Sequence, residues 1–266
     1  MKRVAVIGSV NRDRVWYLNE PLKPGSRLRY SRIETHLGGG AFYTGLQMLD
    51  LGAEVSIVAR LMDDNAGTAI LSELTTRGFD CSNIGWAEGE TEPLEILLEP
   101  NGERTIISKH SAGLPALRAC DKMDHDAVYI NAVNLADSLS GQLDNIPLVI
   151  SQMPLRKATL RPSDIIISSK ADVAGELAEA WQRAKQVGGD RLKTLVLTDG
   201  PSAITIFDGV RAIEVEPKIT VATANSIGAG DRFAGALLFF LLDGHSTVTA
   251  TEEACRVTAE WLESGR

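Results

Sequence analysis

Short runs of β-branched and aliphatic residues alternate with longer amphipathic stretches along most of the chain. The apolar runs predict buried strands at residues 3–8, 55–59, 127–130, 148–151, 164–167 and 194–197. The amphipathic stretches carry apolar residues at three- and four-residue spacing, which predicts helices at residues 40–51, 66–77, 172–187, 228–242 and 251–262. This alternation is typical of an α/β protein whose mostly parallel sheet is covered by helices on both faces.

Two regions depart from this rhythm and predict antiparallel ribbons. One covers residues 28–37, and the other joins residues 94–98 to 105–108 across the turn Pro100-Asn101-Gly102. We expect them to form a small sheet at one edge that acts as a lid, with strands contributed by about residues 14–37 and 93–108. The chain has no Ser/Gly-rich linker and no internal repeat, so we expect one domain over residues 1–266.

Composition narrows the class of protein. The chain is 44% hydrophobic and 23% charged, which is ordinary for a globular protein. Its net charge of −8 and the absence of any long Lys/Arg run argue against nucleic-acid binding. The first apolar stretch, residues 4–7, is too short for a signal peptide or a membrane span, so we expect a cytoplasmic protein without membrane contact. The cysteines lack CxxC spacing and the histidines are scattered, which argues against zinc.

A glycine-rich turn opens the helix predicted after residue 228. Backbone N–H groups of Gly228, Ala229 and Gly230 would converge on an anion there, and glycines let phosphate oxygens approach closely. Asp231 follows in the first helical turn, where the helix dipole favours its ionised form, so it could act as a base toward a hydroxyl. The alternative is a purely structural turn in which Asn225 or Ser226 caps a core helix. The Walker pattern GxxxxGK[ST] is absent.

A second group of polar residues follows the first strand. Asn11 and Asp13 lie where open α/β sheets bind ligands, and both suit sugar hydroxyls; an Asx-type turn is the alternative. About thirty residues later, Gly38 and Gly39 open the segment GGGAFY and permit close approach of a ligand to the backbone.

Together these segments resemble the successive signatures of the ribokinase-like (PfkB) carbohydrate kinase family. The matching segments are GSVNRD, LGGGAFYTGLQMLDLGA, MDDNAG, HSAG at residues 110–113, LVLTDG at residues 195–200, and NSIGAGDRFAGALL. They occur in the family's order and at about its separations, so the similarity covers essentially the whole chain.

The resemblance implies a three-layer α/β/α sandwich with a β-ribbon lid that often mediates homodimers. It also implies transfer of the γ-phosphate of ATP, with Mg²⁺, to a hydroxymethyl group. The implied roles are sugar binding by Asn11, Asp13, Gly38 and Gly39, an anion hole at Gly228, Ala229 and Gly230, catalysis by the base Asp231, and nucleotide contact at Thr198 and Gly200.

The chain departs from the family pattern at several positions. Tyr43 stands where ribose-type members have a sugar-binding Asn, so it could stack on a substrate ring or simply fill space. The NxxE motif becomes Ser169-Lys170-Ala171-Asp172, which leaves Asp172 to hold magnesium through water, or Lys170 to contact phosphate. Asn225, on the nucleotide side, replaces an Asp, so we do not expect activation by a monovalent cation. Relatives continue past the position of Arg266, so we expect a more exposed nucleotide base.

Three functions follow from these features. The leading hypothesis is an ATP-dependent kinase acting on a sugar, with a nucleoside as the alternative acceptor. A ligand-binding homologue with impaired catalysis is the alternative from a different class. A hydroxymethylpyrimidine- or pyridoxal-type kinase is disfavoured by the GSVNRD segment and the predicted ribbon lid. The sequence does not identify the phosphoryl acceptor.

Overall fold

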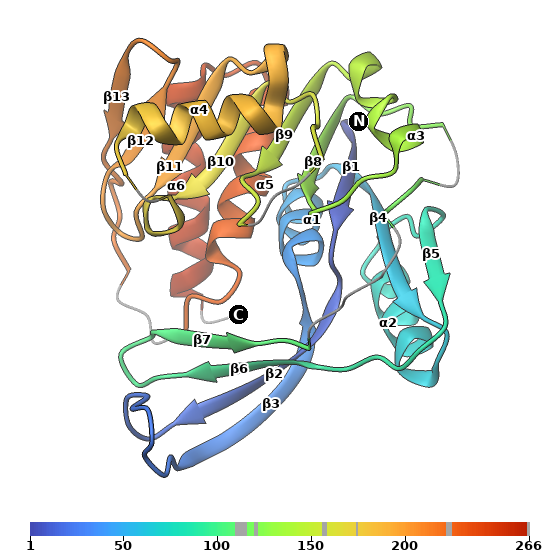
Figure 1. The fold of residues 1–266 in the computed structure, drawn as a ribbon, viewed down its shortest axis with the longest axis vertical. Helices are drawn as coiled ribbons and strands as arrows, with labels where there is room; N and C mark the ends of the chain where they lie inside the picture. The colour runs from blue at the N-terminus through green and yellow to red at the C-terminus, as the bar shows by residue number, and fades with distance from the viewer. Residues whose placement is uncertain (110–115, 120–121, 156–158, 174, 222–224, 265–266) are drawn as a thin grey trace.

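The protein forms two β-sheets of unequal size, and the computed structural model describes residues 1–109, 116–119, 122–155, 159–173, 175–221 and 225–264 (Figure 1). The larger sheet has the strand order β13-β12-β11-β10-β9-β8-β1-β4-β5. Its strands are β1 Arg3–Gly8, β4 Glu54–Met62, β5 Ile84–Ala87, β8 Ala127–Asn131, β9 Leu148–Gln152, β10 Ile165–Ser169, β11 Thr194–Thr198, β12 Ile204–Phe207 and β13 Ala212–Val215. Neighbours from β5 to β11 are parallel, and β12 and β13 are antiparallel. The prediction of a mostly parallel sheet is confirmed.

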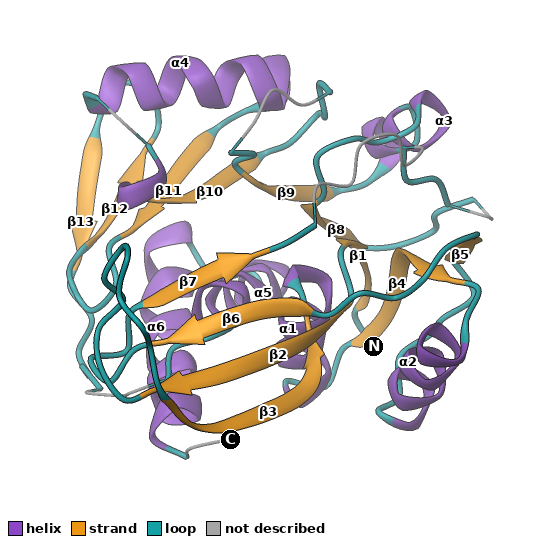
Figure 2. Cartoon of the chain, turned by 60° about the horizontal axis from the view of Figure 1, so that its bottom comes forward, coloured by secondary structure: helices purple, strands orange, loops and turns teal. Residues whose placement is uncertain are grey.

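Helices cover both faces of this sheet (Figure 2). They are α1 Gly40–Asp50, α2 Asn65–Thr76, α3 Asp137–Ser140, α4 Leu177–Gly188, α5 Ala229–Leu242 and α6 Thr247–Glu263, with 3₁₀ turns at Leu143–Asn145, Lys170–Asp172 and Gly189–Arg191. Because strand residues alternate between faces, Val4 and Val6 of β1 join the core under α1, α2, α5 and α6, while Ala5 and Ile7 face α3. A third apolar cluster lies under α4. The predicted three-layer α/β/α sandwich is confirmed.

The smaller sheet lies beside the α1 and α6 side of the sandwich, with strand order β3-β2-β6-β7. Its strands are β2 Asn11–Leu18, β3 Tyr30–Gly38, β6 Leu94–Leu98 and β7 Arg104–Ile107. As the sequence indicates, β2–β3 and β6–β7 are antiparallel ribbons, but β2 and β6 join them by parallel pairing, so the sheet is mixed. We call these four strands the lid.

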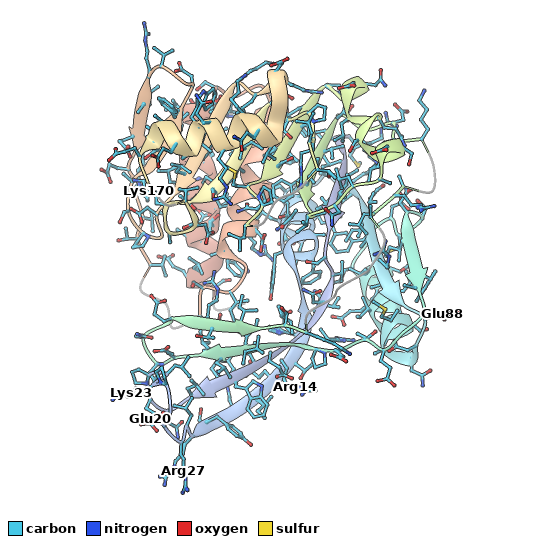
Figure 3. All side chains as sticks on the ribbon, viewed as in Figure 1. Arg14, Glu20, Lys23, Arg27, Glu88 and Lys170 are labelled. Atoms are coloured by element: carbon cyan, nitrogen blue, oxygen red, sulfur yellow. The ribbon has the colours of Figure 1, made fainter. Side chains whose placement is uncertain are left out.

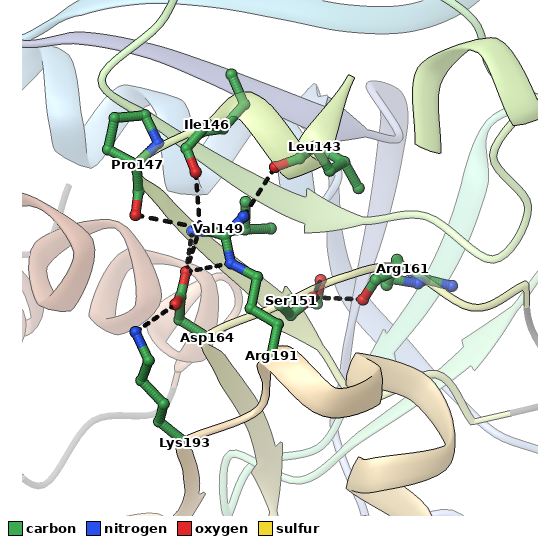
Figure 4. A network of polar contacts seen from close by, with 10 residues as sticks. Leu143, Ile146, Pro147, Val149, Ser151, Arg161, Asp164, Arg191 and Lys193 are labelled. Atoms are coloured by element: carbon green, nitrogen blue, oxygen red, sulfur yellow. Dashed lines mark hydrogen bonds and ion pairs between the residues drawn. The ribbon is translucent and has the colours of Figure 1, made fainter. Parts of the chain in front are cut away.

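A buried ion-pair network aligns the amino ends of three central strands (Figure 4). The Asp164 carboxylate, 4% exposed, accepts the Val149 N–H at 2.9 Å and contacts Arg191 at 2.6 Å and Lys193 at 3.0 Å. Arg191 also donates to the Ile146 carbonyl at 2.6 Å. Because one buried carboxylate satisfies all these donors, β9, β10 and β11 begin in a fixed register, and their carboxyl ends reach one edge of the sheet.

Three details differ from the sequence prediction. The helix predicted at residues 172–187 begins only at Leu177, because Gly175 with φ of +92° interrupts the helical path after the 3₁₀ turn. The helix predicted to begin at residue 251 starts one turn earlier, where the Ser246 hydroxyl caps it by accepting the Thr249 N–H at 3.2 Å. Strands β5, β12 and β13 were not predicted, and each spans only four residues. Within the described ranges, no helix combines the length and apolar character needed to cross a membrane.

Candidate active site

The turn before α5 places its three predicted anion-binding residues together. Gly228 is the N-cap, with φ of +82°, and a Cβ there would lie 2.7 Å from the Tyr43 ring, so both backbone and packing require glycine. The Asn225 carboxamide oxygen accepts the Ile227 N–H at 3.0 Å and braces this turn. Ala229 and Gly230 begin the helix and line an adjoining cavity, and the Ala229 N–H donates to the Ser226 carbonyl at 3.1 Å.

Asp231 is held by a residue that the sequence analysis missed. Asn131 ends β8, and its Nδ2 donates to Asp231 Oδ1 at 3.0 Å. The Thr44 hydroxyl of α1 donates to the Asp231 carbonyl at 3.0 Å, which ties the two helices together beside the site. A signal was present, because Asn131 directly follows a predicted strand, as Asn11 and Asp13 follow another.

The environment of Asp231 differs from the one expected. The helix dipole was expected to favour the ionised carboxylate, but burial dominates and raises the pKa of Asp231 to about 6, against the Asn131 hydrogen bond and the Arg104 charge, which lower it. At pH 7 a group with a pKa near 6 is still about 90% ionised. Asp231 therefore remains a competent base, with a stronger affinity for a proton than an ordinary aspartate.

Asp13 lies in the same region and is 2% exposed. Burial, followed by the negative charge of Asp231, raises the pKa of Asp13 to about 7. Its Oδ1 is buried without a hydrogen-bond partner among the described residues. A Cβ at Gly38 would lie 1.7 Å from Asp13 Oδ2, so the glycine leaves the space that this carboxyl occupies. A buried oxygen without a partner can accept a hydrogen bond from a ligand hydroxyl.

The other residues predicted to bind the sugar lie near the carboxyls of Asp13 and Asp231. Asn11 begins β2 and pairs with Gly38 of β3, and a Cβ at Gly39 would lie 2.4 Å from the Ser9 carbonyl. Tyr43 is 9% exposed, and its ring packs on Gly228 and edge-to-face on Phe42 at 5.3 Å. The Tyr43 ring thus packs against the turn that opens α5.

A cavity of about 900 Å³ opens between the lid turn and the carboxyl end of the sheet. Thr198 and Gly200, at the end of β11, line it together with Ala229 and Gly230, so the predicted nucleotide-contact and anion-binding residues meet in one place. Other residues from the lid turn, α5 and α6 complete the wall, including Asn101, Phe233, Thr258 and Leu262. Its volume suits a ligand of nucleotide size.

The lid contributes a cation to this cavity that the sequence analysis also missed. Arg104 begins β7, and its Nη1 donates to the Ser226 hydroxyl at 3.3 Å, beside the anion-binding turn. Among the described residues that line the cavity, Arg104 is the only lysine, arginine or histidine. Its position is consistent with contact to a bound phosphate.

The residues expected at a metal or phosphate position do not meet the cavity. Asp172 is exposed and does not line it, and Lys170 lies 3.7 Å from Asp199 and 3.9 Å from Glu214 instead (Figure 3). Ser169 does line it. Across the described ranges, no three His, Cys, Asp or Glu side chains form a group that could hold a metal ion. These residues therefore do not fit a protein-built magnesium site. The HSAG segment at residues 110–113 lies outside the described residues.

Comparison with known proteins decides the family. The pfkB family of carbohydrate kinases matches residues 1–143 and 115–264. The chain belongs to this family. It is 21% identical to the ribokinase of Bacillus subtilis over 97% of this chain and 92% of that protein.

Two solved structures of relatives share the fold. The ribokinase of Cryptococcus neoformans in complex with ADP superimposes with a TM-score of 0.75 at 17% identity, over 99% of this chain and 94% of the other. The nucleoside kinase of Methanocaldococcus jannaschii gives 0.73 at 15% identity, over 99% and 92%. The chain is therefore a phosphotransferase of the pfkB type that acts on a hydroxyl group, and the predicted ribokinase-like fold is confirmed.

Proposed function

We propose that this chain transfers the γ-phosphate of ATP to a hydroxymethyl group of a sugar or sugar-like compound. One observation carries the proposal: Asp231, the proposed base, belongs to the same helical turn as Ala229 and Gly230, which line the cavity. That cavity is of nucleotide size, and the negative charge of the Asp231 carboxylate acts on Asp13. A hydroxyl held by Asp13 would thus meet both a base and a bound phosphoryl group.

In this reaction the Asp231 carboxylate accepts the proton of the acceptor hydroxyl. The freed oxygen attacks the γ-phosphorus in line, a new oxygen–phosphorus bond forms, and the bond to the β-phosphate oxygen breaks as ADP leaves. The first-turn amides of α5 and the guanidinium of Arg104 would stabilise the charge on the transferring group. Positioning and electrostatics supply most of the catalysis in phosphoryl transfer, and these groups provide both.

Magnesium is expected to accompany the nucleotide, with its inner ligands supplied by phosphate oxygens and water, because Asp172 is exposed and outside the cavity. Asn225 lacks the carboxylate of its relatives, so turnover should not require a monovalent cation; comparing rates in potassium and tetramethylammonium salts tests this.

A nucleoside is the second candidate acceptor. The fold is shared with the M. jannaschii nucleoside kinase, but the Tyr43 ring packs on Gly228, which weakens the case for base stacking on Tyr43. A screen of pentoses, hexoses and nucleosides by coupled ADP release discriminates the two acceptor classes.

The outer face of the lid supports a homodimer. Trp16 and Tyr30 meet edge-to-face there at 4.9 Å, and Trp16 pairs with Ile33. Ile33 and, two strands from β2 on the same face, Ile107 are 39% and 51% exposed. Sedimentation of wild type and Ile33→Glu should give a dimer and a monomer, and two identical monomers would exclude this interface.

The function is tested with Asp231→Asn, which keeps shape and removes the base. Sugar-dependent ADP release should fall about 10³-fold, with ATP binding retained. If the wild type releases ADP with some acceptor and the variant releases it equally fast, Asp231 is not the base. If the wild type releases no more ADP than the variant because neither responds to any acceptor, the proposed sugar kinase activity is refuted.

A further inference from the structure

Asn131 lies at the junction between β1, β8 and the two site helices. It pairs with Gly8 of the adjacent strand, and a Cβ at Gly8 would lie 2.7 Å from the Asn131 carbonyl oxygen. The backbone at residue 131 is therefore fixed by the sheet. From there its Nδ2 reaches Asp231 Oδ1 at 3.0 Å, across a separation of 100 residues in sequence.

The space for the Asn131 amide is provided by the first residue of α1. A Cβ at Gly40 would lie 1.9 Å from Asn131 Nδ2, 2.6 Å from its Cγ and 3.1 Å from Asp231 Oδ1. The first two distances are shorter than real Cβ contacts and the third is tight, so a side chain at residue 40 would displace the amide. The Asn131–Asp231 bond thus depends on a glycine from a third segment of the chain.

We propose that Asn131 is the positioning residue of the base: it occupies Oδ1 of Asp231, leaves Oδ2 for the substrate proton, and requires Gly40 for its place. The inference rests on the proposed function, in which Asp231 is the base. The orientation follows from chemistry, because an amide N–H₂ only donates and must face a carboxylate lone pair. A donor to the ionised form also favours that form, which opposes the effect of burial on the Asp231 carboxyl.

Other titratable groups face the Asp231 carboxyl. Burial, and after it the charge of Asp231, raises the pKa of Asp13 from β2 and of Tyr129 from β8. Burial, followed by the charges of Asp13 and Asp231, raises the pKa of Tyr43 from α1. Arg104 from β7 favours the charged form. Asn131 differs from all of these because it makes a direct hydrogen bond to the Asp231 carboxylate. Its removal should therefore change both the pKa and the orientation of that carboxylate.

The test compares pH profiles of kcat for wild type, Asn131→Ala and the isosteric Asn131→Asp. Loss of one hydrogen bond to a carboxylate should move the acid limb up by about one pH unit in Asn131→Ala, which lowers kcat near pH 5 about tenfold. Asn131→Asp, which preserves packing but adds a negative charge, should move the limb further. The KM for ATP should stay within twofold. The matched control is Asn134→Ala, an exposed asparagine three residues away, which should retain the wild-type profile.

A double-mutant cycle tests the role of Gly40. Gly40→Ala should reproduce the shift of Asn131→Ala, because it displaces the same amide. In the Asn131→Ala background it should add little, since the 1.9 Å clash no longer exists. Full additivity of the two changes would show that Gly40 acts independently of Asn131 and would overturn that part of the proposal.

A measurement independent of turnover separates this inference from the proposed function. The ¹³C carboxyl resonance of Asp231, assigned by its loss in Asp231→Asn, is titrated in wild type and in the Asn131 variants. An upward shift in both variants supports the positioning role even if no acceptor is phosphorylated. Unchanged titration in Asn131→Ala and Asn131→Asp overturns it, whether or not the chain proves to be a kinase.

Discussion

Replacing Asp13 with Asn should stabilise the protein while it impairs the site. Asp13 is 2% exposed and has an unpartnered oxygen, and burial holds its pKa at about 7 against an ordinary 3.8. A carboxyl whose pKa is raised on folding is neutral in both states below about pH 4 and costs nothing there. As the pH rises from 4 to 7 the unfolded chain ionises first, so folding stability is progressively lost.

The magnitude follows from the two pKa values. A difference of about three pH units at about 1.4 kcal/mol each gives a cost of ~4 kcal/mol above pH 7. Asp13→Asn removes this cost, so its free energy of unfolding should exceed that of wild type by up to ~4 kcal/mol at pH 8. The two proteins should be equally stable near pH 4.

Urea unfolding of both proteins at pH 4, 5, 6, 7 and 8 measures the difference directly, with the exposed Asp63→Asn as control. The gap should widen by about 1.4 kcal/mol per pH unit up to pH 7 and then level off. Acceptor-dependent kcat/KM should fall in the same variant, because the ligand loses a charged hydrogen-bond acceptor. If the free energy of unfolding changes with pH in the same way for wild type and Asp13→Asn, folding does not raise the pKa of the Asp13 carboxyl and the argument is refuted.

Two other substitutions test the nucleotide side of the site. Arg104→Gln should lower kcat/KM for ATP about 100-fold, because it removes the lone cation among the described cavity-lining residues. The control Arg14→Gln, on the outer face of the lid (Figure 3), should change kcat/KM less than twofold; equal effects of the two changes would show that only the general charge of the lid matters. Asp172→Ala should leave the Mg²⁺ concentration for half-maximal rate within twofold of wild type, because the Asp172 carboxylate is exposed outside the cavity. A tenfold increase in that Mg²⁺ concentration would show that Asp172 contributes to magnesium binding.

The sequence predicts those parts of the site that lie within a single segment. The Gly-rich turn at Gly228 and the helix that follows are adjacent in the chain, so their geometry can be derived from local rules. The central strands are equally predictable, because buried parallel strands are apolar on both faces. The start of α4 is less so: the apolar spacing extends to residue 172, and only the positive φ of Gly175 shows where the helix cannot continue.

Asn131 and Arg104 could not be predicted from the sequence, because their contacts are not local. Each acts across more than 90 residues of sequence, Asn131 on Asp231 and Arg104 on Ser226, so their partners follow from strand order and lid placement and not from spacing. The pKa of Asp231 was misjudged for the same reason. The helix dipole is visible in the sequence, but burial, the larger effect, depends on what the rest of the chain places around the carboxyl.

The lid links the two halves of the site through its strand register. Asp13 is on the same face of β2 as Tyr17, which pairs with Leu98 of β6, and Leu98 in turn pairs with Arg104 of β7. Side chains two residues apart share a face, as do directly paired residues, so Asp13 and Arg104 project from the same side of one sheet. Asp13, the proposed contact to the acceptor, and Arg104, the proposed contact to phosphate, are therefore carried on one face of the same sheet. We infer that an acceptor bound at Asp13 also sets the position of Arg104 through this sheet, which would make phosphoryl transfer wait until both substrates are bound.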